Sequence, residues 1–293
     1  NMAEAHPVAF RFVMKAKERG ATVIHVDPRF SRTSAMADLH VPIRPGSDIA
    51  WLGGLIHYVL ENGLYSKEYV VNYTNAPVII HRDFQDTDAL DGLFSGFDPE
   101  KRRYETETWQ YLGEPVPPSG RHPEGMTTET FTDKVGHLTQ GPFPEDRTLQ
   151  DPHCVLQILK RHYARYTPEM VERTCGIAPA QFLKVARALV ENSGRERTTA
   201  WCYAVGWTQH TTGVQLIRAA SVLQLLLGNI GRPGGGILAL RGHSSIQGST
   251  DIPTLYNLLP GYMSQPHAKK PHDTLADYCL LYTSDAADDL TRV

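Results

Sequence analysis

Cysteine is scarce in this chain of 293 residues, where it occurs at Cys154, Cys175, Cys202 and Cys279. None of the four stands in a CxxC pair, so the sequence has neither the spacing of a zinc site nor that of a local iron–sulfur site. We therefore predict no metal ligand within the chain. Isolated cysteines usually pack as small hydrophobic residues, and they leave the redox compartment undecided.

Long apolar runs and a large net charge are also missing. The longest apolar stretch, around 222–227, falls far short of the roughly 20 residues that a membrane helix needs. The net charge is −3 and the basic residues are dispersed, so we predict no nucleic-acid partner. The sequence also lacks a GxGxxG fingerprint, a P-loop and an HExxH helix, which argues against a nicotinamide Rossmann domain and a zinc protease.

What is present is an alternation of short apolar strands with amphipathic helices. Strands are predicted over 22–27, 40–43, 198–205 and 237–240. Helices are predicted over 6–19, 47–60, 152–163, 179–192 and 213–227, and a short helix is predicted to start at 167–169. This order predicts an α/β fold with a Rossmann-like parallel sheet flanked by helices. Residues 83–150 are rich in Asp, Glu, Gly, Pro and Thr, which predicts a long, irregular surface insertion.

The two ends of the chain read as artificial. The chain opens in the middle of a motif at Asn1, and residues 279–293 resemble a translated sequencing-library adapter. We therefore expect an α/β domain over 1–243, the start of a second, truncated domain over 244–278, and a non-native tail after that.

Two strand ends carry residues that suit a nucleotide. Asp27 follows the first strand and could accept hydrogen bonds from ribose hydroxyls, although a turn-forming Asp before proline would look the same. Gly46, Ser47 and Asp48 begin a helix, whose free N–H groups suit a phosphate, although an ordinary cap at Ser47 or Asp48 is the simpler interpretation. The carboxylate of Asp48 also matches the two adjacent N–H groups of a guanine edge.

Two further segments follow later strands. Val205–His210 is a Gly-aromatic-polar loop between a strand and a helix, a common ligand-contacting arrangement in α/β sheets. Arg241 ends the last predicted strand, after a glycine-rich turn. Its guanidinium could bind a carboxylate through two parallel bonds, although a surface arginine would show the same pattern.

Taken together, these motifs resemble the bis-molybdopterin guanine dinucleotide enzymes, the dimethyl sulfoxide reductase family. The segments that carry the resemblance are Asn1–Pro7, Val26–Arg29, Ile43–Asp48, Gly206–His210 and Leu227–Gly231. Ala239–Gly248, Leu259–Met263 and the stretch 69–98 are similar to the catalytic subunits of molybdenum or tungsten formate dehydrogenases in particular. The resemblance covers nearly all of residues 1–265.

The resemblance implies a role for each matching residue. One guanine dinucleotide arm would be held by Asn1, Met2, Ala3, Glu4, Asp27, Arg29, Gly46, Ser47 and Asp48. The pterin or dinucleotide near the metal would contact Val205, Gly206, Trp207, Gln209, His210 and Gly242. Arg241 matches the family's active-site arginine, which orients formate, and His243 would shape the same catalytic pocket. The metal-ligating selenocysteine or cysteine and the 4Fe-4S ligands would lie outside this chain.

As implied by the resemblance, the cofactor is bis-molybdopterin guanine dinucleotide with Mo or W, together with a 4Fe-4S cluster. The expected partners are formate, an iron–sulfur electron-transfer subunit and a membrane cytochrome subunit. A periplasmic, membrane-associated enzyme is expected, with a cytoplasmic one as the alternative. Two other functions stay open: a nitrate or other oxyanion reductase of the same superfamily, and a non-catalytic scaffold like some subunits of respiratory complex I.

Overall fold

The computed structural model describes residues 1–113, 143–240, 242, 274 and 276–277. The chain divides into two units, Asn1–Leu240 and Arg241–Val293, and almost all described residues belong to the first. Arg241 and His243, most of the predicted domain 244–278 and the predicted tail 279–293 lie outside the described residues. The predicted domain boundaries therefore remain predictions.

Four strands of the first unit pair in parallel. β1 (Ile24–Val26) pairs with β2 (Leu39–Val41), and β5 (Ala200–Tyr203) pairs with β6 (Gly236–Ala239). Parallel strands joined by helical connections confirm the predicted α/β class. The described strands nevertheless form two separate two-stranded parallel sheets where one sheet was predicted.

A side chain of a neighbouring helix occupies one position where a further strand could pair with β2. Gln181 lies on α9 (Pro179–Glu191), and its Nε2 donates to the main-chain oxygen of His40 on β2 at 3.0 Å. The carbonyl is thereby satisfied without another strand, as a partly buried backbone acceptor must be. This bond also joins the first strand pair to the helical layer.

All the predicted helices are present, and several short ones were not predicted. The helices of the first half are α1 (Met2–Ala5), α2 (Pro7–Glu18), α3 (Arg32–Met36), α4 (Asp48–Glu61) and α5 (Lys67–Tyr73). Those of the second half are α7 (Val155–Tyr163), α8 (Pro168–Cys175), α9, α10 (Val205–Thr208) and α11 (Gly213–Leu226). As predicted, Thr167 caps α8: its hydroxyl accepts from the backbone N–H of Met170 at 3.3 Å. No helix in this described part of the chain is long and apolar enough to span a membrane.

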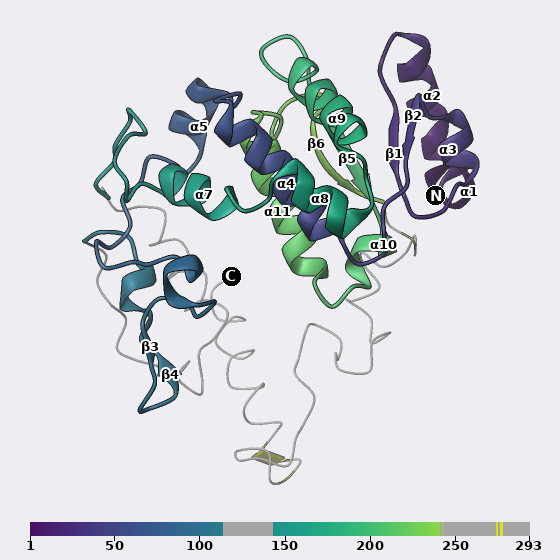
Figure 1. Ribbon diagram of the computed structural model, residues 1–293. Coiled ribbons are helices and arrows are strands. Elements are labelled where there is room, and N and C mark those ends of the chain that lie inside the picture. Colours follow the sequence, from purple (N-terminus) through teal and green to yellow (C-terminus); the bar gives the residue numbers. More distant parts are fainter. Residues whose placement is uncertain (114–142, 241, 243–273, 275, 278–293) are drawn as a thin grey trace. The chain divides into compact units, whose positions relative to one another are not determined.

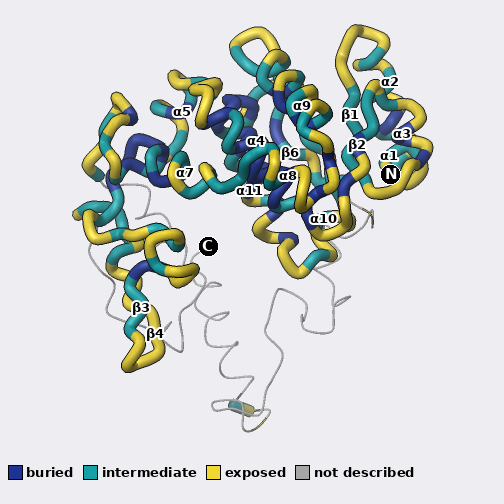
Figure 2. Tube along the Cα trace, viewed as in Figure 1, coloured by how far each residue is buried: buried dark blue, intermediate teal, exposed yellow. Residues whose placement is uncertain are grey.

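Helix α4 forms the centre of the core. It contacts α7, α8, α9 and α11, and Figure 1 shows it running between α8 and α11. Trp51 is 2% exposed and meets the ring of Phe182 edge-on, with ring centroids 5.5 Å apart. Burial is densest around α4 and α11 in Figure 2. The start of α4, which carries Asp48, is thus fixed by a helix packed on several sides.

The predicted insertion is partly ordered where it is described. Residues 83–113 form two 3-10 turns, η1 (Thr87–Leu90) and η2 (Thr106–Trp109), and a short antiparallel pair, β3 (Phe97–Asp98) with β4 (Arg103–Tyr104). The far end of the insertion rejoins the core. There Leu149 is fully buried, and Glu145 bridges to Val78, so Leu149 is part of the core, whereas Glu145 and Gln150 are exposed.

Candidate functional site

The N-terminal residues predicted to bind the cofactor lie against α3. The Asn1 side-chain N–H donates to Glu4 at 2.7 Å, and the Ala3 backbone N–H donates to the Thr33 hydroxyl at 2.9 Å. Thr33 in turn donates to the Asn1 amide oxygen at 3.4 Å. The bond from Asn1, helped by the backbone N–H of Arg32, lowers the pKa of Glu4. Glu4 is therefore an ionised acceptor at neutral pH. Met2 is half-buried in α1.

Asp27 lies directly after β1, as predicted. One carboxylate oxygen accepts from the backbone N–H of Arg29 at 2.7 Å, and the other lies 3.6 Å from the His25 imidazole. The second ring nitrogen of His25 is hydrogen-bonded to Ser34 on α3 at 2.8 Å. The Arg29 side chain is exposed. The first strand end thus presents a part-exposed carboxylate beside an exposed guanidinium.

The turn before α4 differs from the expected cap. Gly46 has a φ of +82°, which favours glycine, and a Cβ there would meet no atom within 4 Å. Ser47 stands at the N-cap, but its hydroxyl donates backward to the Arg44 carbonyl at 2.7 Å and makes no cap bond. The predicted N-cap position of Ser47 is confirmed, but its side chain does not make the expected bond to the helix. The first N–H groups of α4 are left without that partner and could donate to an anion.

Residues 205–208, predicted as part of a loop, form the single-turn helix α10. The short turn places the Trp207 indole against the start of α4, where its N–H donates to Asp48 Oδ1 at 3.2 Å. The Trp207 ring stacks on Tyr203 of β5 with centroids 5.2 Å apart and an interplanar angle of 22°. It also lies 5.9 Å from the ring of Trp201. Two segments that the sequence singled out separately therefore meet through one indole.

Of the remaining predicted site residues around α10, three are exposed and one has a buried ring nitrogen. Val205, Gly206 and Gln209 are exposed. The Nδ1 atom of His210 is buried and has no hydrogen-bond partner among the described residues. A buried imidazole nitrogen without a partner costs free energy. A bound ligand that supplied a donor or acceptor there would remove that cost.

Leu240, which follows β6, contacts both the N-terminal segment and the end of β5. The backbone N–H of Leu240 donates to the Tyr203 carbonyl at 2.7 Å, and its own carbonyl lies 3.4 Å from the His6 imidazole. Arg241 follows directly in the sequence, and Gly242, which is described, is exposed. Leu240 is thus fixed between the N-terminal segment and the end of β5. The predicted roles of Arg241 and His243 remain predictions.

Three residues to which the sequence analysis gave no role contribute to this region: Thr33, Tyr203 and His6. Alternation along a strand places Trp201 and Tyr203 on the same face of β5, which is a signal that could have found Tyr203. Thr33 and His6 act through partners about 30 and 234 positions away in the sequence. No local pattern reveals such contacts.

The residues present have the chemistry that a nucleotide-bearing cofactor needs. Carboxylates at Asp27 and Asp48 suit ribose and base donors, the uncapped start of α4 suits phosphate, and His210 has a ring nitrogen without a partner in the described part of the chain. In the described ranges, no group of three or more His, Cys, Asp or Glu residues could hold a metal ion directly. Two surface hollows, of about 350 and 470 Å³, lie elsewhere, beside Lys160 and beside Phe94.

The fold and this region define an α/β protein that gathers ligand-type residues at the carboxyl ends of its parallel strands. Comparison with known protein families identifies the family to which this α/β protein belongs. Residues 1–283 match the molybdopterin oxidoreductase family, and the chain belongs to that family. Membership implies a molybdopterin cofactor.

Among curated proteins the chain is similar to formate dehydrogenase subunits. It is 45% identical to the major subunit of the nitrate-inducible formate dehydrogenase of Escherichia coli, over 94% of this chain and 26% of that protein. It is 44% identical to the formate dehydrogenase 2 subunit alpha (cytochrome c-553) of Nitratidesulfovibrio vulgaris, over 95% of this chain and 25% of that protein. The chain thus spans about a quarter of the length of these relatives. Their names, major subunit and subunit alpha, imply enzymes with further subunits.

An F420-dependent formate dehydrogenase subunit alpha of Methanococcus maripaludis is 26% identical over 91% of this chain and 27% of that protein. Among solved structures, acetylene hydratase from Pelobacter acetylenicus matches with a TM-score of 0.44 and 18% identity, over 77% of this chain and 20% of that chain. That structural likeness is too weak to bear on fold or function.

Proposed function

We propose that the intact protein is the catalytic subunit of a formate dehydrogenase. It would oxidise formate to carbon dioxide and one proton, with the two electrons passing to iron–sulfur clusters. The observation that supports this substrate is the 45% identity to a formate dehydrogenase major subunit over most of the chain. The carboxylate of Asp27 directly after β1 and the bond between Trp207 and Asp48 support the cofactor.

The residues of this chain would bind and orient. Asp27 and Asp48 would accept hydrogen bonds from the ribose and the guanine, and the first N–H groups of α4 would bind a phosphate. The pterin–metal group, with molybdenum or tungsten, would supply the acceptor for the two electrons. Arg241 would pair with the formate carboxylate through two parallel bonds and hold the C–H bond in one pose.

The test is a substitution in the full-length enzyme. Arg241→Ala should lower kcat/KM for formate, measured with a dye acceptor, by about 100-fold or more, by analogy with other donors that stabilise charge in a reaction. Arg241→Lys keeps the charge but cannot form two parallel bonds, so it should recover only part of the activity. The exposed Arg173 on α8 is a matched control, and Arg173→Ala should leave turnover unchanged. Normal turnover in Arg241→Ala would contradict the proposal.

Two measurements separate the neighbouring functions. Reduction of nitrate or dimethyl sulfoxide by the intact enzyme, without formate oxidation, would favour another reductase of the same superfamily. An intact protein that holds neither molybdenum nor tungsten would favour a non-catalytic scaffold. We further propose an iron–sulfur electron-transfer subunit and a membrane cytochrome subunit as partners, with a periplasmic, membrane-associated location. Cell fractionation that found the protein in the cytoplasm would contradict that location.

A further inference from the structure

We propose that Trp207 is a positioning residue that fixes the carboxylate of Asp48 for recognition of guanine, and so sets the selectivity of this site for a guanosine nucleotide. The inference rests on the function proposed above, because it assumes a guanine-containing cofactor. It assigns Trp207 a different task from direct cofactor contact, which the sequence suggested. The one polar atom of its side chain is already used on Asp48.

The first step of the argument is the number of bonds that Asp48 can accept. An ionised carboxylate offers about four lone-pair positions on two oxygens. Trp207 Nε1 uses one of them, on Oδ1 at 3.2 Å. The remaining positions are enough for the two adjacent N–H groups of a guanine edge. Trp207 and guanine can therefore bind the same carboxylate together.

The second step is that the indole is itself held in place. Its ring stacks on Tyr203 and lies near Trp201, two residues on the same face of β5. The Trp207 backbone packs closely against the start of α11. A Cβ added at Gly213 would lie only 2.6 Å from the Trp207 carbonyl oxygen. Such close backbone contact is possible only at glycine. The donor to Asp48 thus belongs to a rigid unit.

The third step is the effect of that donor on selectivity. A carboxylate at a helix start can rotate about two side-chain bonds, and an unheld rotamer spends only part of its time facing a ligand. A bond from a fixed N–H removes that freedom before the nucleotide arrives. This raises the affinity mainly for a base that donates hydrogen bonds to both carboxylate oxygens. Guanine does so, whereas hypoxanthine lacks the 2-amino donor.

The test compares GDP with IDP on full-length protein produced without the pterin cofactor, by titration calorimetry. Trp207→Phe keeps an aromatic ring but removes the N–H donor. It should weaken GDP binding by about tenfold or more, the effect of a hydrogen bond to a charged group, and should weaken IDP binding less. Asp48→Asn should also lose the preference for GDP over IDP. The double variant Trp207→Phe/Asp48→Asn should bind GDP no more weakly than Asp48→Asn, because both substitutions disrupt the same Trp207–Asp48 interaction. The holoenzyme gives a second readout, the amount of GMP released per metal atom, which should fall in Trp207→Phe.

A tryptophan of the insertion is a matched control. Trp109 Nε1 donates to the Ser95 carbonyl at 2.8 Å, so Trp109→Phe also removes an indole donor but should keep the full preference for GDP. If Trp207→Phe does not fold, Asp48→Glu leaves the aromatic packing intact, moves the carboxylate by one methylene group and should also lose the preference. An unchanged GDP preference in Trp207→Phe or Asp48→Glu, an equal loss in Trp109→Phe, or additive losses in the double variant would overturn the inference. A wild-type protein that prefers GDP but does not oxidise formate would contradict the proposed function and support this inference.

Discussion

His25 connects strand β1 to Asp27 and to α3. One ring nitrogen bonds Ser34 at 2.8 Å, and the other lies 3.6 Å from the Asp27 carboxylate. Burial lowers the pKa of His25, and the nearby His40 adds to this, while Asp27 opposes it. The imidazole of the folded protein is therefore neutral at a pH where an exposed histidine already binds a proton.

We expect this residue to make the protein less stable in mild acid. Below pH 6.5, the ordinary histidine pKa, the unfolded chain takes up a proton that folded His25 does not. The contribution of His25 to stability is thus complete above pH 6.5 and is lost as the pH falls through the lowered pKa. Thermal unfolding of full-length wild type and His25→Gln between pH 8 and pH 5 measures the effect. The variant should lose less stability than wild type below pH 6.5, whereas His81→Gln should follow wild type. Parallel curves for wild type and His25→Gln would refute the expectation.

The positions of single residues could be predicted where the local sequence determines them. Asp27 stands where the β-branched run ends, and the position of Asp48 follows from the helix that begins there. Burial was harder to predict. The helical spacing of Val8 and Phe12 suggests a packed face, yet these side chains are 68% and 63% exposed, and Phe10 is the buried residue of α2. Which face of a helix is covered depends on tertiary neighbours, and a short sequence window does not contain them.

At the scale of elements, a buried polar group holds β5, β6 and α11 together. Asn229 is fully buried, and its amide N–H groups lie 2.8–2.9 Å from acceptors on Ser193, Thr199 and Gln224. The Gln224 amide donates to carbonyls at both strands, on Thr199 and Gly236, each at 2.7 Å. Such a network specifies one arrangement because a partner left unsatisfied is costly.

Replacing Asn229 should weaken this arrangement substantially. Asn229→Ala leaves buried polar atoms of Ser193, Thr199 and Gln224 with fewer partners, so it should cost about 2–4 kcal/mol of stability. Urea or thermal unfolding of the full-length protein measures the loss. The control is Asn62→Ala at the exposed end of α4, where one side-chain bond to Tyr58 is removed; it should cost less than about 1 kcal/mol. An equal loss of stability in the two variants would show that the buried network contributes no more than one exposed hydrogen bond.

Elements were predictable to the extent that periodicity and capping signals mark them. The helix at 179–192 and the cap at Thr167 agree with α9 and α8 within a residue. Helix α10 was missed because four residues carry no helical period. The division into two strand pairs was missed because pairing depends on which acceptors the helices satisfy, as Gln181 does for β2.

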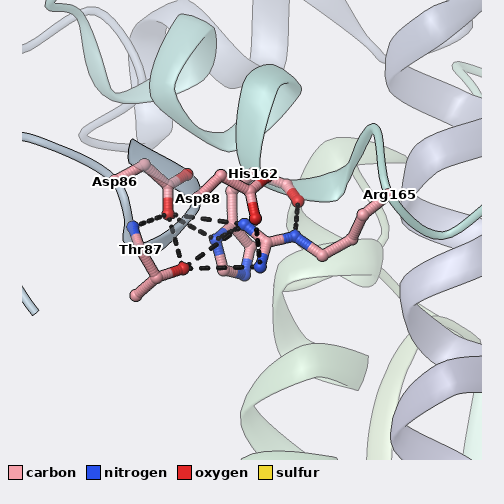
Figure 3. Close-up of polar contacts among 5 residues, drawn as sticks. All are labelled: Asp86, Thr87, Asp88, His162 and Arg165. Atoms are coloured by element: carbon pink, nitrogen blue, oxygen red, sulfur yellow. Dashed lines mark hydrogen bonds and ion pairs between the residues drawn. The ribbon is translucent and has the colours of Figure 1, made fainter. Parts of the chain in front are cut away.

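At the scale of the whole first unit, one cluster links the insertion to the helical body. Arg165, just after α7, donates from Nε to the His162 carbonyl at 2.8 Å and pairs with Asp88 at 3.1 Å (Figure 3). His162 lies 3.1 Å from Asp86, and the Thr87 hydroxyl joins the same group. Burial raises the pKa of Asp86, but its bonds to His162 and Thr87 outweigh this and lower it. The carboxylate therefore stays ionised at neutral pH and holds the insertion in place.

Breaking this cluster should loosen the insertion without unfolding the core. In Arg165→Ala, Asp86 and Asp88 lose a charged partner, and we expect tryptic cleavage after residues 101–103 of β3–β4 to rise about tenfold, the effect of one charge-assisted bond. Mass spectrometry of fragments from the full-length protein measures the rate. Arg173→Ala, on the neighbouring helix α8, should leave it unchanged. A cleavage rate in Arg165→Ala equal to that of wild type would show that other contacts hold the segment.

The bond between Trp207 and Asp48 also determines when the proposed guanine site can form during synthesis of the chain. The two residues are 159 positions apart, and a ribosome adding roughly 5–20 residues per second needs roughly 8–30 s to pass from one to the other. During that interval the nascent chain displays an acidic helix start without the indole that completes it. The proposed guanine site is therefore complete only after this region has been translated.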